Sequence, residues 1–478
     1  MSRDASGPEP SDVDADGGST PRRRRGGVVL VSSAAALGGF LFGYDTSVIN
    51  GTVDAIEDQF NMSSELLGFV VSSALLGAAV GAWFAGPIAD RIGRVRSMVI
   101  AAVLFFIGAI GSALATGPVT LTVWRIIGGM AVGAASVIAP AYIAEMAPAR
   151  LRGRLGSLQQ LAIVLGIFVA LLIDALLANI AGSAADELAL GGKAWRWMFA
   201  TAAVPAILYG LISLTIPESP RYLVRRGNVE QARKTLRRYV GGDTDERIKE
   251  IQHSLGTGAE DVRLRDLRGP RLGLQPIVWT GILLSVFQQF VGINVIFYYS
   301  TTLWRSVGFQ ENDALLISVI TSLVNIVGTF IGIALIDRIG RKALLLIGAS
   351  VMFVTLGLLS YCFSKASGSG TDVSLASPWD TIALYSANVY VLSFAFSWGP
   401  AVWVLLGEMF NNRIRATALA VAAAAQWLAN FAISQTFPTL SGVSLTLAYG
   451  LYTAFALLAL VFVAAAVRET KGRELETM

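Results

Sequence analysis

About twelve long apolar segments divide this chain, and each is about 20 residues long. At 1.5 Å per residue, about 20 helical residues cross a hydrocarbon core of about 30 Å, whereas buried helices of soluble proteins need only about 10–14 apolar residues. Only 15% of the residues are charged, against roughly a quarter in soluble domains. The pattern predicts an all-α membrane protein with twelve transmembrane helices, centred roughly on residues 40, 78, 106, 133, 168, 206, 288, 323, 353, 394, 426 and 456.

Basic residues gather beside alternate ends of the apolar segments, while the other connections are acidic or nearly neutral. Lys and Arg are enriched in cytoplasmic loops, so this asymmetry predicts a multi-pass protein of the plasma membrane with both termini in the cytoplasm. The basic positions are Arg22 to Arg25, Arg91, Arg94, Arg96, Arg150, Arg152, Arg154, Arg413 and Arg415, and the acidic ones after the first segment are Asp54, Glu57 and Asp58.

Cysteine and histidine each occur once, as Cys362 and His253. A disulfide needs two cysteines and a Cys/His metal site needs a cluster, so neither is expected here. The sequence also shows no pairing of a nucleophile with a base and no phosphate-binding loop. We therefore expect neither an enzyme nor a cofactor, and no nucleic-acid partner for the formal net charge of +4.

Composition divides the chain into five parts. The first, residues 1–26, is rich in Ser, Asp, Gly and Pro, so we expect a disordered cytoplasmic tail. A charged stretch at 220–272, with an apolar stripe at Ala232, Leu236, Tyr239 and Val240, predicts short amphipathic helices between two halves. The halves are expected at 27–219 and 273–468, each a six-helix bundle, and 469–478 is expected to be a second cytoplasmic tail.

Two short motifs recur in the two halves, at matching places. The stretch 88–94 (IADRIGR) after the second segment matches 335–341 (LIDRIGR) after the eighth. The Glu145-to-Arg152 spacing after the fourth segment matches the Glu408-to-Arg415 spacing after the tenth. Parallel repeats of this kind are typical of secondary transporters whose halves rock around a central site.

The charged residues of these motifs lie where helices are expected to end on the cytoplasmic side. Carboxylates and guanidiniums from adjacent segments can pair in bidentate fashion, so we interpret them as a gate whose pairs form when the inside is shut. The alternative is a set of arginines that simply reach the membrane interface. The candidate gate residues are Asp90, Arg91, Arg94, Glu145, Arg152, Asp337, Arg338, Arg341, Glu408 and Arg415.

Several motifs together resemble the sugar porter family of the major facilitator superfamily. They are 43–46 (GYDT), 125–129 (RIIGG), 217–221 (PESPR), 288–294 (QQFVGIN) and 469–472 (ETKG), and Arg468 departs from the Pro that usually precedes the last. The resemblance runs from about residue 28 onward and is strongest to actinobacterial glucose–proton symporters and the bacterial xylose–proton symporter. It implies alternating access and adds Glu218 and Glu469 to the candidate gate.

Two ionisable residues are expected inside the membrane at the same depth. Asp45 lies about 25 Å up the first segment, and Arg125 lies about 8 Å below the outer end of the fourth. A carboxylate that alternates between an arginine and a proton suits proton coupling, while a static ion pair is the alternative. The resemblance supports coupling, since related uniporters have Asn at this position. Asp174 is a rival carboxylate that we expect to be hydrated near the outer end of the fifth segment.

Side-chain amides in the central segments predict a site for a neutral polyol, because an amide both donates and accepts hydrogen bonds. Gln289 and Asn294 would point about 140° apart on a straight helix, so we expect a break at Gly292. Gly399-Pro400 is expected to kink the tenth segment and turn Trp403 toward the cavity. The candidates are Gln160, Gln288, Gln289, Asn294, Asn325, Gln426, Asn430 and Trp403, with Phe42, Tyr298, Tyr299 and Trp427 as gate aromatics, although membrane aromatics often only pack.

These features favour import of a monosaccharide with protons by a monomeric carrier. Ile167 replaces a Gln of the xylose symporter and is shared by glucose carriers, so the resemblance indicates D-glucose. A facilitative uniporter, or a symporter of xylose, inositol or another polyol, is the main alternative. A drug exporter would have acidic or apolar residues in place of the amides. A sugar sensor would have a long signalling tail, which is not expected after Gly472.

Overall fold

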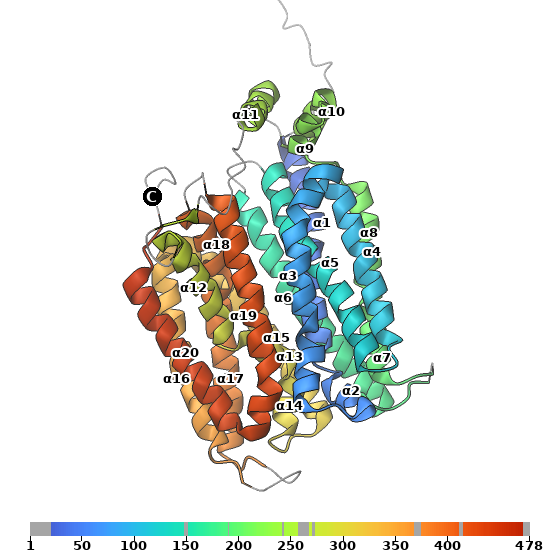
Figure 1. Ribbon diagram of the computed structural model, residues 1–478, viewed down its shortest axis with the longest axis vertical. Coiled ribbons are helices and arrows are strands. Elements are labelled where there is room, and N and C mark those ends of the chain that lie inside the picture. Colours follow the sequence, from blue (N-terminus) through green and yellow to red (C-terminus); the bar gives the residue numbers. More distant parts are fainter. Residues whose placement is uncertain are drawn as a thin grey trace, which may run out of the picture.

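The computed structural model describes residues 21–147, 152–189, 191–240, 243–256, 267–269, 273–367, 374–410 and 414–471. Side chains are described from residue 27, except at 152–154, 156, 254–256, 415 and 416. Within this part of the chain, 12 helical segments are long and apolar enough to cross a membrane, and each predicted segment centre falls inside one of them. The helices pack as two bundles side by side, with a few short helices at either end (Figure 1).

The first bundle contains six spans. The sixth is divided at Ala202 into two helices, and a short helix, α2, follows the first. The backbone is already helical at Pro21, inside the tail that we expected to be disordered up to residue 26. The bounds are α1 Pro21–Val48, α2 Val53–Phe60, α3 Ser64–Ile92, α4 Arg94–Ala113, α5 Pro118–Met146, α6 Arg152–Ala181, α7 Ala194–Thr201 and α8 Ala203–Thr215.

The segment between the bundles forms short helices, α9 Pro220–Arg225, α10 Val229–Thr235 and α11 Thr244–Gly256, with a π-helical turn at Leu236–Val240. Ala232 and Leu236 of the predicted apolar stripe are buried. These helices lie at the end of the molecule where the C-terminus is marked (Figure 1). We call it the α9–α11 end, and the opposite one, where α2 and α14 lie, the α2–α14 end.

The second bundle repeats the plan of the first, with interruptions in its first and fourth spans. The chain breaks at Gly292 between α12 and α13 and at Ser397 between α17 and α18. Pro400, which lacks an N–H, lies in the first turn of α18, next to the predicted kink. The bounds are α12 Pro276–Phe290, α13 Ile293–Tyr298, α14 Ser300–Arg305, α15 Glu311–Ile339, α16 Arg341–Phe363, α17 Trp379–Phe396, α18 Trp398–Met409, α19 Arg415–Val443 and α20 Leu445–Ala466.

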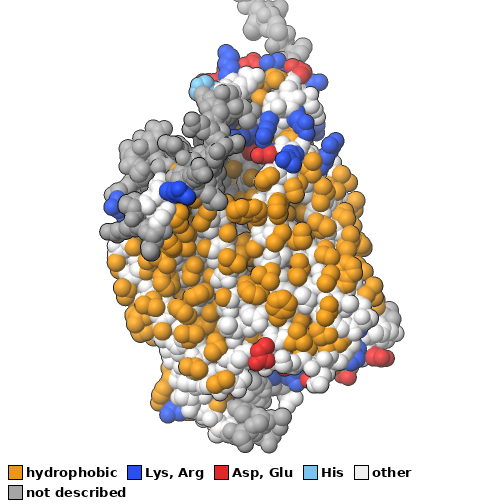
Figure 2. Space-filling model, in the orientation of Figure 1, with side chains coloured by type: hydrophobic (Ala, Val, Ile, Leu, Met, Phe, Trp, Pro, Cys, Tyr) orange, Lys and Arg blue, Asp and Glu red, His pale blue; other side chains and the backbone are white. Residues whose placement is uncertain are grey.

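Side-chain type follows the expected membrane placement. Figure 2 shows hydrophobic side chains spread over the middle of this face, with charged ones gathered toward its two ends. Leu211, Leu214 and Val354 are each more than half exposed. Such a broad apolar surface would aggregate in water but is what lipid tails require.

Helices α3 and α5 pack backbone to backbone through two Gly-x-x-x-Gly stretches. A Cβ at Gly129 would lie 2.0 Å from the carbonyl oxygen of Ala74, and one at Gly81 would lie 2.0 Å from that of Met130. Lipid tails are as apolar as Leu, so close contact of this kind supplies much of the attraction between membrane helices.

We therefore expect Gly129→Ala to destabilise the fold, since the added methyl meets backbone that cannot rotate away. Overpacking typically costs about 1–3 kcal/mol. The measurement is the melting temperature and folded yield of purified protein in detergent. Gly86→Ala on α3 is the matched control, because its Cβ would have no atom within 4 Å. Equal melting temperatures for the two variants would contradict this packing argument.

Candidate functional site

Asp45 on α1 and Arg125 on α5 meet inside the first bundle. The Nη1 atom of Arg125 lies 3.3 Å from Oδ1 of Asp45, and Nη2 donates to the carbonyl oxygen of Val71 at 3.3 Å. Their side chains are 14% and 4% exposed. The Nε atom of Arg125 is buried without a hydrogen-bond partner among the described residues. The hydrogen-bonding capacity of Arg125 is therefore incompletely satisfied within the described part of the chain.

The pair lines a cavity of about 10 Å³ that also reaches the second bundle. This volume is about the smallest that holds one water molecule. Phe42 and Trp427, from α1 and α19, meet edge to face beside it with ring centroids 5.4 Å apart, and Tyr298 completes the wall. Three of the four predicted gate aromatics thus lie against the ion pair, at the interface of the bundles.

A chain of amides crosses the predicted break in the seventh span. Gly292 has φ +85°, a backbone conformation that side chains other than glycine rarely adopt. The turn brings Asn294 back toward α12, where its Nδ2 donates to Oε1 of Gln289 at 2.6 Å. Gln289 donates to Gln288 at 3.3 Å, and Gln288 donates to the carbonyl oxygen of Trp398 at 2.9 Å. The expected convergence of Gln289 and Asn294 is present.

A second polar group contains Asn430 of α19, Tyr298 at the end of α13 and Tyr299 directly after it. Asn430 donates to the hydroxyl of Tyr298 at 3.4 Å and accepts from Ser434 at 3.2 Å. Tyr299 donates to the carbonyl oxygen of Ser434 at 3.0 Å and packs against Phe437. Tyr299 therefore contacts α19, the helix that carries Asn430, but does not line the small cavity at Asp45.

The other candidates lie around the interface without joining the amide chain. A Cβ at Gly399 would lie 3.9 Å from Nε2 of Gln160, so α6 and α18 face each other across the bundles here. Trp403 is four residues after Gly399, on the same helix face, and is 43% exposed. Gln426 has a buried Oε1 with no partner in the described structure, and Asn325 is 6% exposed. Unpaired buried amide oxygens of this kind can accept hydrogen bonds from a ligand.

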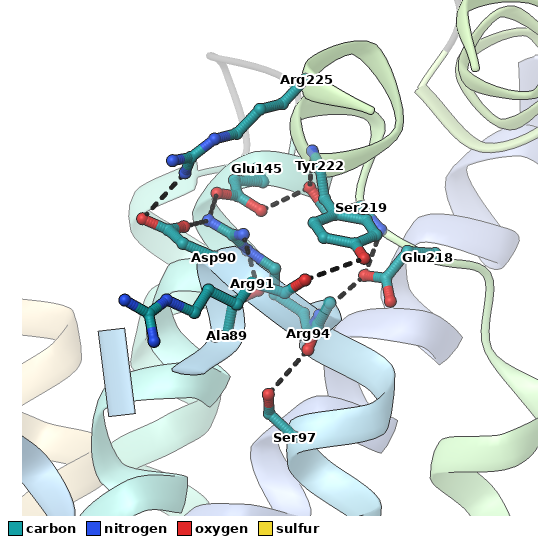
Figure 3. A network of polar contacts seen from close by, with 11 residues as sticks. Ala89, Asp90, Arg91, Arg94, Ser97, Glu145, Glu218, Ser219, Tyr222 and Arg225 are labelled. Carbon is teal, nitrogen blue, oxygen red and sulfur yellow. Dashed lines mark hydrogen bonds and ion pairs between the residues drawn. The ribbon is translucent and has the colours of Figure 1, made fainter. Parts of the chain in front are cut away.

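The first repeat motif builds a polar network at the α9–α11 end (Figure 3). Nη2 of Arg94 lies 2.9 Å from both Asp90 and Glu145. Glu218 accepts from the backbone N–H groups of Arg94 and Val95 at 2.9 and 3.2 Å, at the N-terminus of α4. A carboxylate at a helix N-terminus satisfies unpaired N–H groups and the helix dipole. The network continues through Ser219 to Glu145 and through Arg225 to Asp90.

The second motif repeats this network at the start of α16. Arg341 pairs with Glu408 through two contacts of 2.8 and 3.1 Å and with Asp337 at 3.1 Å. Glu469 accepts from the backbone N–H groups of Arg341 and Lys342, both at 3.0 Å. Thr470 takes the place of Ser219 and donates to Glu408 at 2.6 Å. Glu218 and Glu469 therefore occupy equivalent positions in the two halves. The repeated motifs in the sequence did not show this equivalence.

Glu469 shows the strength of this arrangement. Partial burial acts to raise the pKa of its carboxyl, but four backbone N–H groups, those of Lys471, Arg341, Lys342 and Thr470, hold the pKa below its usual value. A lowered pKa stabilises the fold above the ordinary pKa of Glu, and this contribution is lost as pH falls through the lowered value.

The networks lie within single bundles. The described ion pairs of the two networks join helices of one half to each other or to α9, and the others at this end join residues of α10 and α11. An effect of the networks on gating therefore has to act by fixing the helix ends of one half. The side chains of Arg91 and Arg338 form no ion pair with a described residue, whereas their carbonyl oxygens accept from Arg226 and Lys471. Arg152 and Arg415 were also predicted to belong to the gate, but their side chains lie outside the described part of the structure.

We expect Arg341→Lys to destabilise the protein more than Arg94→Lys. Arg341 holds Glu408 through both Nε and Nη2, a fork that lysine cannot reproduce, while Arg94 contacts Glu145 through Nη2 alone. A charge-assisted hydrogen bond contributes about 1.5–3 kcal/mol. Melting temperatures of the two purified variants measure the difference, and a larger loss in Arg94→Lys would contradict it.

The described hydrogen bonds between the bundles gather at the α2–α14 end, and the sequence did not reveal them. Asn50 donates to Ser318 at 3.3 Å and accepts from the backbone N–H of Thr301 at 3.0 Å. Asp54 accepts from Thr302 at 2.6 Å and pairs with Arg305 at 2.5 Å. The sequence shows the acidic residues after the first span, but it does not show that α14 lies beside them.

Asp174 corrects one expectation. We expected this carboxyl to be hydrated near the end of its span, but its side chain is fully buried. Oδ2 accepts from the backbone N–H of Gly51 at 3.3 Å, and Oδ1 has no described partner. The loop between α1 and α2 covers it, which the position of Asp174 along α6 could not show.

Comparison with known proteins now bears on this geometry. The family model described as "Sugar (and other) transporter" matches residues 31–478. The chain belongs to the sugar transporter family. It is 56% identical to a glucose transport protein of Synechocystis sp., over 93% of this chain and 95% of that protein. It is 40% identical to the D-xylose-proton symporter of Escherichia coli, over 92% of this chain and 93% of that one.

Solved structures agree with the fold of this sugar transporter. The partially occluded inward-open conformation of the xylose transporter from E. coli matches with a TM-score of 0.80 at 37% identity, covering 94% of this chain and 100% of that one. The same symporter bound to 6-bromo-6-deoxy-D-glucose matches with a TM-score of 0.78. The predicted architecture of two six-helix bundles is confirmed, and the chain is a multi-pass membrane transporter rather than an enzyme.

Proposed function

We propose that this sugar transporter imports a monosaccharide, D-glucose, together with protons by alternating access. The observation that carries the proposal is the position of the Asp45–Arg125 pair beside the interface that holds the amides. The pair lines one small cavity with Tyr298, and Tyr298 accepts a hydrogen bond from Asn430. A movement of the Asp45–Arg125 pair can therefore be transmitted to Asn430, a candidate sugar-binding residue, through the side chain of Tyr298.

Proton coupling follows from the chemistry of this pair. A buried carboxylate is stabilised by the guanidinium, and separation from it without hydration favours the protonated form. If the halves rock, Arg125 on α5 and Asp45 on α1 need to separate only slightly from 3.3 Å for Asp45 to take a proton. The E. coli relative is named as a proton symporter, which supports this assignment.

Glucose as the substrate is supported by two observations. The Synechocystis relative is named for glucose transport. Ile167, which replaces a polar residue of the xylose symporter, is buried on α6, and its backbone N–H lies close to Gly43 of α1. An apolar residue there offers no hydrogen bond, so the remaining amides would set the sugar preference.

The orientation is part of the proposal. We assign the α9–α11 end, with its many Lys and Arg side chains, to the cytoplasm, and the α2–α14 end to the outside of the plasma membrane. The bundles are joined at the outer end by Asn50 and Asp54, so the structure corresponds to an outward-closed state. We expect the protein to act as a monomer, since the proposed route for the sugar lies between its own two bundles.

Uptake of labelled glucose into proteoliposomes tests the proposal. With a pH gradient imposed, acidic outside, the transporter is expected to concentrate glucose, and a protonophore is expected to remove the accumulation. Equilibration without accumulation would identify a uniporter. Competition by xylose, inositol and other unlabelled sugars ranks the substrates, and a panel in which xylose competes better than glucose would reject glucose as the preferred substrate.

A further inference from the structure

Asp174 is a buried acid for which the proposed mechanism has no use. Its side chain has no measurable exposure, and Oδ1 is buried without a hydrogen-bond partner in the described part of the chain. The backbone N–H of Gly51 donates to Oδ2 at 3.3 Å. No described Lys, Arg or His forms an ion pair with it, in contrast to Asp45, which has Arg125 at 3.3 Å. A lone carboxylate buried in a membrane protein costs several kcal/mol, so burial in this form favours the neutral acid.

The titratable side chains on the helices packed against α6 near this end have other partners. Tyr44 of α1 bonds to Thr201, and Asp45 of α1 pairs with Arg125 of α5. Arg196 of α7 donates to the carbonyl oxygens of Ala113 and Ala115, and Glu311 of α15 accepts from the N–H of Ala184, while Asp313 is exposed.

Asp174 supports the segment that ties the two bundles together. Gly51, which it holds, follows Asn50, and Asn50 contacts Ser318 and Thr301 of the second bundle. Asp54 lies three residues after Gly51 and contacts Thr302 and Arg305 of α14. A Cβ at Gly51 would lie 2.7 Å from Cβ of Asp174, so the loop rests directly on this side chain. Opening of the α2–α14 end has to move this loop and thereby let water reach the carboxyl.

We propose that Asp174 is a second proton-binding site, neutral while the α2–α14 end is closed and ionised when opening admits water. Protonation of Asp174 and closure of the α2–α14 end then favour each other. Binding of a proton shifts the equilibrium toward the state that binds the proton more tightly, which is the closed state. Only the assignment of this end to the outside rests on the proposed function. A proton arriving from outside would then promote closure over a bound sugar, separately from the exchange at Asp45.

Accessibility of an engineered cysteine tests this directly. The sequence contains one cysteine, the buried Cys362, so Cys362→Ala supplies a background without thiols. Leu67 is 2% exposed and lines a 220 Å³ cavity between the bundles at the α2–α14 end, together with Tyr299 and Phe437. Leu67→Cys should therefore react with a membrane-impermeant maleimide mainly when this end opens. The probe is the maleimide alone, without sugar or gradient.

Labelling rates of Leu67→Cys are compared between Asp174 and Asp174→Asn proteins from pH 5 to pH 9, so that the pH dependence of the thiol cancels in the ratio. Asn is neutral and keeps an acceptor for Gly51. We expect the labelling rate of the protein with Asp174, divided by that of Asp174→Asn, to be near one at low pH. This ratio should rise about tenfold at high pH, where the ionised carboxylate favours opening, since one proton changes an equilibrium by at most tenfold per pH unit. A ratio that stays constant would overturn the proposal.

Three further proteins make the result specific. Asp313→Asn, an exposed acid in the first turn of α15, should leave the pH profile unchanged. Asp54→Asn, which loses its pairing with Arg305, should raise labelling at every pH. Asp174→Ser gives a second neutral variant in case Asp174→Asn does not fold. Gradient-driven uptake should persist in a folded neutral variant, and its complete loss with an unchanged labelling profile would assign Asp174 to another role. Failure of proton symport itself would appear only in uptake.

Discussion

Asp45→Asn is expected to abolish the accumulation of sugar driven by a pH gradient while sugar exchange across the membrane continues. An amide can still accept the hydrogen bond that Arg125 donates at 3.3 Å, so the fold and the cavity are retained. It cannot take up and release a proton, so the link between sugar and proton movement is lost. The variant should behave as a uniporter.

The size of this effect follows from the driving force. One proton entering across a potential of ~150 mV supplies ~3.5 kcal/mol, which sustains an accumulation of about a few hundred-fold. In the variant the ratio of internal to external sugar should fall to about one. Steady-state accumulation in proteoliposomes measures the loss, and counterflow of labelled sugar verifies that the protein still transports. The exposed Asp313→Asn is the matched control. Uphill accumulation by Asp45→Asn would rule out Asp45 as the coupling residue.

The second large effect is expected for Gln289→Ala. This side chain accepts from Asn294 at 2.6 Å and donates to Gln288 at 3.3 Å, and it is 4% exposed. Its removal leaves a buried donor and a buried acceptor unpaired, each at a cost of about 1–3 kcal/mol, and takes one amide from the candidate sugar site. Sugar affinity should fall about 10- to 100-fold.

Equilibrium binding of glucose to the purified protein, followed by titration calorimetry, measures this change. Gln231→Ala is the control, because Gln231 is an exposed glutamine on α10, outside the membrane-spanning helices that carry the candidate amides. The melting temperature of Gln289→Ala separates a loss of affinity from a loss of folding. Unchanged affinity in a folded variant would remove Gln289 from the sugar site.

Much of the architecture could be predicted because it depends on local properties of the chain. The length of an apolar segment decides whether a helix can span a bilayer, so all twelve spans were located. Depth could be compared by counting residues along a straight helix, which brought Asp45 and Arg125 to one level. The break at Gly292 followed from the requirement that two amides five residues apart share one side.

The parts that could not be predicted are contacts between distant residues. Glu218 and Glu469 occur in different local sequences, and only the structure shows that both end on the N-terminus of the helix after the repeated motif. Asn50 has nothing in its neighbourhood that indicates Ser318, 268 residues away. Asp174 was expected to meet water because a helix position gives depth but not the loop that covers it.

The sequence by itself determined the number of spans and the amide character of the central segments, since these depend on composition and spacing within about 30 residues. It also determined the grouping into two related halves, because short motifs recur at matching places in both. Tertiary structure alone decided which end of the interface is closed and which carboxyls are paired, capping a helix or buried alone. Those outcomes depend on how two bundles pack, and the cost of burying a charge depends on every neighbour that packing brings to it.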